Sequence, residues 1–146
     1  RVISRSTASI RGYRIISPDS IILPKRGGAI ATNKKRLLTR PAILDPNLMG
    51  ITPKSQRLLS EFLLSWFETF DLKTISSGST VPQLNRRDLL PILLPIPSEY
   101  TQQQVVASAN QIRQEIDDMQ VINIQNSTFL TGMEQAILSR AFRGEI

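Results

Sequence analysis

Two aspartates and a lysine come nearest to forming a hydrolytic site in this 146-residue chain. Asp19 follows a proline, and Asp71 lies two positions before Lys73. Two carboxylates holding a divalent metal, with a lysine beside them, would suit hydrolysis of a phosphodiester bond. The two aspartates are far apart, however, and Asp71 comes directly after a predicted helix rather than in a hairpin. We therefore attribute the pattern to chance and keep a nuclease that uses these three residues as an alternative.

Other catalytic chemistry has little support. The chain contains no His and no Cys, so the usual proton shuttle, thiolate nucleophiles and the commonest zinc ligands are absent. No glycine-rich nucleotide-binding motif occurs, and no Ser or Thr has an evident activating partner. Gly27 and Gly28 could present backbone amides to a phosphate, but a plain hairpin turn explains them equally well. The sequence predicts a chain that is not an enzyme and binds no metal or cofactor of its own.

Positive charge is concentrated in the first two thirds of the chain. Residues 1–97 contain 15 Lys and Arg against 6 Asp and Glu, whereas residues 98–146 contain 3 against 6. This asymmetry suits a module that faces a polyanion, although a well-solvated surface would show the same excess. Basic side chains beside predicted turns can reach phosphates. The candidates are Lys25, Arg26, Lys34, Lys35, Arg36, Arg86 and Arg87.

A polar loop precedes the last two of these arginines. Ser79, Thr80 and Gln83 offer uncharged donors and acceptors, which suit the reading of base edges more than the strength of binding. Asn85 lies in the same stretch, and we interpret it as the cap of a short helix. The predicted DNA-binding residues therefore divide into phosphate contacts and base-reading contacts.

The predicted elements of the first 97 residues are short strands, one amphipathic helix and one short helix. Apolar runs between turn residues predict the strands, at 13–16, 21–23, 29–32, 37–38, 42–44 and 48–51. Apolar and aromatic residues at steps of three and four predict a core helix over 57–70, with Ser55 as its N-cap. A helix over 85–90, stopped by Pro91, and a buried strand over 92–94 complete the prediction.

A long helix is predicted from Thr101 to Phe142, with Gln104 completing a capping box. At the standard rise it would be about 60 Å long. Its apolar positions alternate in steps of four and three, as in a coiled coil, with two asparagines forming a polar layer that can fix register. The predicted helix-pairing residues are Val105, Ala109, Ile112, Ile116, Met119, Asn123, Asn126, Leu130, Met133 and Ile137.

Length and composition place further limits on the chain. No apolar run approaches the roughly 20 residues of a membrane span, and the first residues have no signal-peptide core. The absence of Cys suits a reducing cytoplasm. The chain begins at Arg1 rather than Met, inside strand-rich sequence, and we expect it to be a fragment of a longer protein.

Two stretches, in the right order, resemble the DNA-specificity (S) subunit of Type I restriction–modification enzymes. Residues 78–97 give a turn, a short helix, an apolar run and a proline exit like the end of its target recognition domain. Residues 136–146 are similar to the closing signature of the family, and residues 19–27 and 45–53 resemble its earlier strands. Together these stretches extend the resemblance over nearly the whole chain.

The resemblance implies an α+β fold, with a partial target recognition domain at 1–97 and a conserved spacer helix at 98–146. Members of the family are non-catalytic: two recognition domains each read half of a split double-stranded DNA site, and the two spacer helices pair antiparallel. Modification subunits bind S-adenosylmethionine and methylate adenine, and restriction subunits cut. In this chain one domain and one helix are present, so two copies are expected to pair through the helix.

Two departures from the family pattern are visible. The usual opening strands are missing, and the helix entry, ordinarily Pro-Pro followed by Glu-Gln, here runs from Ile96 to Gln103. A non-specific nucleic-acid-binding module that assembles through a coiled coil is the second alternative.

Overall fold

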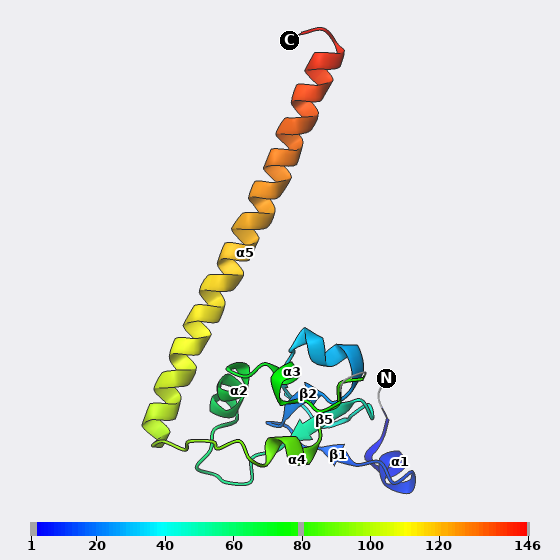
Figure 1. The fold of residues 1–146 in the computed structure, drawn as a ribbon, viewed down its shortest axis with the longest axis vertical. Coiled ribbons are helices and arrows are strands. Elements are labelled where there is room, and N and C mark those ends of the chain that lie inside the picture. The colour runs from blue at the N-terminus through cyan, green and yellow to red at the C-terminus, as the bar shows by residue number, and fades with distance from the viewer. Residues whose placement is uncertain (1–2, 79–80, 146) are drawn as a thin grey trace. The chain divides into compact units, whose positions relative to one another are not determined.

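The computed structural model describes residues 3–78 and 81–145, and it divides into two compact units, Arg1–Val106 and Ala107–Ile146. Its helices and strands confirm the α+β class (Figure 1). In chain order they are α1 (Arg5–Ile10), β1 (Ile15–Ile16), β2 (Ile21–Pro24), the 3-10 helix η1 (Gly27–Thr32), β3 (Arg36–Leu37), β4 (Ala42–Ile43), β5 (Leu48–Ile51), α2 (Ser60–Glu68), α3 (Leu72–Ile75), α4 (Arg86–Leu89) and α5 (Glu99–Phe142).

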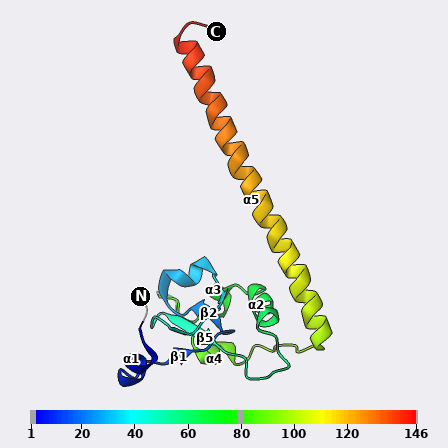
Figure 2. The same cartoon turned by 180° about the vertical axis from the view of Figure 1, so that it is seen from behind.

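The central sheet has the order β3-β2-β5, and both pairs are antiparallel. Ile21 of β2 lies opposite Leu37 on one side and Ile51 on the other. A separate two-stranded sheet joins β1 and β4, with Ile15 opposite Ile43. In both views α3 and α4 lie on opposite sides of β2 and β5 (Figures 1 and 2). The central strand is therefore covered on both faces, which explains why its sequence is a continuous apolar run.

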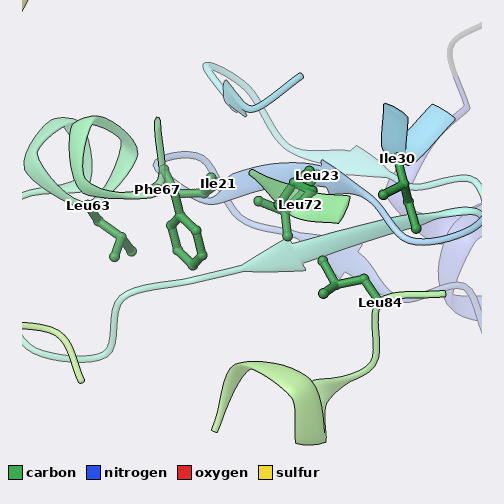
Figure 3. Packing of buried hydrophobic residues seen from close by; sticks show 7 residues of the cluster. All are labelled: Ile21, Leu23, Ile30, Leu63, Phe67, Leu72 and Leu84. Atoms are coloured by element: carbon green, nitrogen blue, oxygen red, sulfur yellow. The ribbon is translucent and has the colours of Figure 1, made fainter. Parts of the chain in front are cut away.

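The core of the first unit draws on five segments. Buried side chains come from β2, η1, α2, α3 and the residue before Asn85 (Figure 3). They are Ile21, Leu23, Ile30, Leu63, Phe67, Leu72 and Leu84. Trp66 of α2 packs edge-on against Phe67 and Phe70, with ring centroids 5.1 and 4.6 Å apart. The prediction that this aromatic face packs in the core is confirmed, because Phe62 and Phe67 are buried.

Two predicted strands are wrong. Residues 29–32 belong to η1, which begins at Gly27 with φ of 71° and is followed by Asn33 with φ of 51°, so that left-handed residues stand at both ends of a tight turn of helix. Residues 92–94 pair with no strand among the described residues, and Leu93 is 89% exposed. The three prolines at 91, 95 and 97 remove backbone donors around this segment, which prevents a regular ladder.

The predicted start of the aromatic helix is also wrong. Its N-cap is Leu59, whereas the Ser55 hydroxyl accepts a hydrogen bond from the amide of Arg57 at 3.2 Å, inside the preceding loop. The loop thus has its own local cap, and α2 is shorter than the apolar period indicated.

The long helix α5 begins two residues earlier than predicted. Ser98, and not Thr101, provides the capping oxygen, which accepts from the Thr101 amide at 3.2 Å. The far end at Phe142 agrees with the prediction, and Gly132 lies inside the helix without breaking it. No helix of the described residues is long and apolar enough to cross a membrane.

Candidate nucleic-acid interface

Two basic segments far apart in the sequence lie side by side in the first unit. The carbonyl of Lys25 accepts from the amide of Leu84 at 2.8 Å, and the amide of Gly27 donates to Pro82 at 2.9 Å. Between these two bonds, Arg26 and Gln83 form an antiparallel bridge. The segment after β2 and the segment leading to α4 therefore lie side by side as paired extended backbone. We call Lys25, Arg26, Gln83, Arg86 and Arg87 the paired basic patch.

Gln83 is held on both of its sides. Its amide donates to the carbonyl of Ser77 at 2.7 Å, and its carbonyl accepts from the Ser77 amide at 2.8 Å. Because Arg26 bridges Gln83 on the opposite side, the backbone of Gln83 is the middle strand of a miniature sheet. Its position is thus fixed by four neighbouring backbone hydrogen bonds rather than left to a free loop.

The short helix α4 places two arginines beside Gln83. The Asp88 carboxylate accepts from the amide of Asn85 at 2.7 Å, which closes the first turn of the helix. Arg86 and Arg87 are exposed, and together with Gln83 and Asn85 they line one shallow, open depression. A long contact of 3.9 Å joins the exposed Arg87 side chain to the largely buried Asp88 carboxylate. It leaves Arg87 able to contact another anion, since a loose ion pair of an exposed arginine contributes little. Asn85 is the N-cap residue of α4, as the sequence indicated.

The loop before this patch depends on a glycine. Gly78 has φ of 93°, and a Cβ atom there would lie 2.8 Å from the carbonyl oxygen of Val81. A side chain at this position would force the loop to change. Ser79 and Thr80, the other two predicted base-reading residues, lie outside the described residues.

Lys35 is in the interior, contrary to the expectation that it reaches phosphates from a polar tip. Only 3% of the residue is exposed, and its Nζ donates to the Asn33 side-chain oxygen at 2.8 Å and to the Phe70 carbonyl at 2.5 Å. Burial lowers the pKa of Lys35, and the charges of Asp71 and Glu68 oppose that shift. Its neighbours Lys34 and Arg36 are exposed, so two of these three basic residues remain available at the surface.

The side chain of Asn33 accepts two hydrogen bonds that the sequence did not reveal. Besides the Lys35 ammonium, its Oδ1 accepts from the amide of Leu72 at 2.9 Å. It therefore joins the end of η1 to the start of α3, and its left-handed backbone turns the chain toward β3. The only sequence signal was its type, since Asn tolerates this conformation more readily than most residues; its distant partners leave no trace in the local pattern.

The residues of the nuclease alternative have local structural roles. The Asp71 carboxylate accepts from the Lys73 amide at 2.9 Å and caps α3, and Asp19 occupies a left-handed turn with φ of 60°. Among the described residues no group of three or more Asp and Glu could hold a metal ion. The arrangement gives this alternative no support.

The predicted helix-pairing residues of α5 are exposed or half-exposed in the single chain. Among the large apolar side chains the exposed fraction runs from 41% at Val105 to 64% at Leu130, while Ala109 is half-buried. Additional apolar residues that the predicted seam did not include are exposed at its centre, among them Val121, Ile122 and Ile124. The pairing itself stays a prediction, and so does the division of function at residues 97 and 98.

A small α+β domain with a paired basic patch, continued by a long helix, defines the structural class of this chain. The family of the Type I restriction modification DNA specificity domain matches residues 12–125. The chain therefore belongs to this family, which confirms the family that the sequence resembles; the match includes residues 78–97, whereas residues 136–146 lie beyond it.

Solved structures show the same fold. A chain from a study of complex assembly and conformational transition of the type I R-M system superposes with a TM-score of 0.76 at 22% identity, over 91% of this chain and 33% of that chain. The HsdS subunit from Thermoanaerobacter tengcongensis gives a TM-score of 0.62 at 21% identity, over 90% of this chain and 31% of that chain. This chain thus spans about a third of each of these proteins. No curated protein sequence matches it significantly.

Proposed function

We propose that this chain is a sequence-specific DNA-recognition part of a Type I restriction–modification complex, and that it reads one half of a split double-stranded site. The observation that supports the proposal is the bridge between Arg26 and Gln83, which brings the two basic segments of the paired basic patch together around the Gln83 carboxamide. Membership of the DNA specificity family supports DNA as the ligand of the patch.

The patch contains both kinds of group that specific recognition needs. Lys25, Arg26, Arg86 and Arg87 supply charge for phosphates, with Lys34 and Arg36 as further exposed contacts. Gln83 supplies a carboxamide that can bind adenine through two hydrogen bonds in the major groove. Because its backbone is bonded on both sides, the amide starts from a defined position, which favours selectivity. Ser79 and Thr80 extend the proposed base-reading loop.

The exposed apolar seam of α5 gives the chain a second proposed role, in assembly. In a full-length specificity subunit its partner is the other conserved helix, antiparallel; for this chain alone it is a second copy related by two-fold symmetry. The chain is non-catalytic in this proposal. Modification subunits carry S-adenosylmethionine and methylate the site, and restriction subunits join the full complex.

Selection from a randomised duplex pool tests the recognition role. The experiment uses the intact specificity subunit assembled with its modification subunits, as wild type, as Gln83→Ala and as a double variant with Arg86→Ala and Arg87→Ala. Lys54→Ala is the matched control, since it removes an exposed positive charge outside the paired basic patch.

Wild type should enrich a split motif. Gln83→Ala should lose discrimination at one position of one half-site, by about 1–3 kcal/mol, and keep its affinity for random DNA. The double arginine variant should bind all duplexes more weakly. The slope of the logarithm of its binding constant against the logarithm of salt concentration should be shallower by about one for each lost phosphate contact. A wild-type complex that enriches no motif would instead support the non-specific nucleic-acid module.

A further inference from the structure

Gln102 is a fully buried polar residue in the first turn of α5. Its exposed fraction is 0%, whereas Glu99, Thr101 and Gln103 beside it are exposed. Glutamine is a surface residue in most proteins, and a buried carboxamide is retained where its hydrogen bonds are satisfied. Gln102 belongs to the first compact unit, as do all the groups that it contacts.

The Gln102 amide makes three hydrogen bonds to backbone groups. Its Oε1 accepts from the amide of Leu59 at 2.9 Å, and its Nε2 donates to the carbonyls of Arg57 at 2.8 Å and Pro97 at 3.0 Å. Both amide hydrogens are used. Only one orientation of the amide is possible, because the opposite one would aim an oxygen at two carbonyl oxygens.

These bonds join the start of α5 to the loop before α2. Arg57 and Leu59 flank Leu58, whose side chain packs against the core cluster. On the other side, Pro97 immediately precedes the helix, and the backbone amide of Gln102 donates to Ser98 at 3.0 Å. The amide thus satisfies two backbone groups of the loop at residues 57–59 and attaches the first turn of α5 to the recognition domain's core.

We propose that Gln102 is a positioning residue that restricts the directions in which α5 can leave the recognition domain. The helix is continuous over 44 residues, so a tilt of its first turn by about 10° moves its far end by about 11 Å at 1.5 Å per residue. One buried side chain therefore controls a large displacement. If the proposed function holds, that direction also sets which spacing between the two half-sites is accepted.

The variants follow from the geometry of the three bonds. Gln102→Ala removes all of them, and Gln102→Glu keeps the shape but turns a carboxylate toward two carbonyl oxygens. Gln102→Asn is milder, since it shortens the side chain by one methylene. Gln103→Ala is the matched control: it removes the neighbouring glutamine, whose amide makes one exposed contact of 3.3 Å with Glu99.

The absence of cysteine from the chain permits a direct measurement with two spin labels. Labels at Glu61→Cys in α2 and Gln120→Cys in α5 report the distribution of distances between the domain and the helix. A large excess of unlabelled chain ensures that both labels of a measured pair belong to one molecule. Gln102→Ala and Gln102→Glu should widen the distribution about twofold, and Gln103→Ala should leave it unchanged.

Hydrogen exchange at the Leu59 amide provides a second measurement. In Gln102→Ala and Gln102→Asn this amide should exchange at least tenfold faster, while the amide of Leu23 in β2 keeps its protection. A variant that only lowered global stability would accelerate both amides together. If Gln102→Ala does not fold, Gln102→Asn carries both measurements. An unchanged distance distribution in a folded Gln102 variant, or a wild-type distribution as wide as that of the variants, overturns the proposal.

The consequence for DNA is measured separately in the assembled complex. The test compares the affinity for a target whose spacer is changed by one base pair with the affinity for the cognate target. The ratio of these two affinities should be about tenfold higher for Gln102→Ala than for wild type. A complex that shows no base preference at all contradicts the proposed function, while the spin-label result on the chain itself still decides the role of Gln102.

Discussion

The two compact units use their apolar residues in opposite ways. In Arg1–Val106 the side chains of Ile21, Leu23 and Leu72 are at most 1% exposed. In Ala107–Ile146 the residues Ile112 and Ile116 are 56% and 47% exposed. Burial of one such side chain is worth about 1.5–3 kcal/mol, so the first unit has a core of its own, whereas the apolar surface of the second is stabilising only when another helix covers it.

Polar residues show the same contrast. Ser20, Lys35 and Gln102 are buried in the first unit, and no buried side-chain nitrogen or oxygen of the described residues lacks a hydrogen-bond partner. Asn123 and Asn126 of the helix are exposed. The first unit therefore satisfies its polar groups internally and can hold a defined recognition surface, whereas the polar layer of the helix has a role only in the presence of a partner.

The strongest test of this contrast is a charge in the exposed seam. Ile116→Asp should weaken helix pairing by at least about a hundredfold, because a carboxylate buried without a partner costs roughly 3–5 kcal/mol. The recognition unit should keep its melting transition, since Ile116 lies outside it. Sedimentation equilibrium over a concentration series measures the association. Glu134→Asp is a control that adds no new charge, and a wild-type chain that stays monomeric at high micromolar concentration would show that the seam does not pair two copies.

Substituting one asparagine in each unit should have different effects on stability. Asn33→Ala removes the oxygen that accepts from both the Lys35 ammonium and the Leu72 amide. It should lower the free energy of unfolding by about 2–4 kcal/mol, since one of the two donors that lose this acceptor is charged. Asn123→Ala should leave the unfolding of the first unit unchanged. Denaturant titration followed by Trp66 fluorescence distinguishes them, because Trp66 is the single tryptophan and lies in α2. Equal effects of the two substitutions would contradict the contrast.

The same contrast explains which features were predictable from the sequence. Apolar spacing predicted β2, β5 and α5, because it records which face is buried, and the family resemblance implied the α+β class. The prediction failed at residues 92–94, where an apolar run belongs to no strand of the described residues. The roles of Asn33 and Gln102 were hidden for another reason: their partners are distant backbone groups, and a hydrogen bond of that kind imposes no pattern on the neighbouring sequence. Lys35 was assigned to the surface on its charge and its place beside a predicted turn.

Lys34 and Lys35 allow the contrast between surface and interior to be examined at adjacent positions. In the intact subunit, Lys34→Ala should make the slope of log K for DNA binding against log salt concentration shallower by about 0.9, the value for one phosphate contact. Lys35→Met should leave that slope unchanged, because its ammonium is bonded to Asn33 and Phe70 inside the domain. Binding measured from 50 to 200 mM salt, with folding checked by thermal melting, gives the comparison. A lower slope for Lys35→Met would place its charge at the DNA.

The smallest expected effect is a dependence of stability on alkaline pH. Burial lowers the pKa of Lys35 below its ordinary value of 10.5, so between the two values the unfolded chain binds more protons than the folded one. Stability contributed by this residue must therefore rise with pH through that window. Below the window both states are protonated, and the cost of burying the charge is fully present. The difference in unfolding free energy between wild type and Lys35→Met should thus shift in favour of wild type as the pH increases from 8 to 10.5. Titrations of both proteins at several pH values measure the difference, which also cancels the ionisation of the tyrosines they share. A constant difference across this range would mean that the Lys35 ammonium is as well solvated in the folded domain as in the unfolded chain.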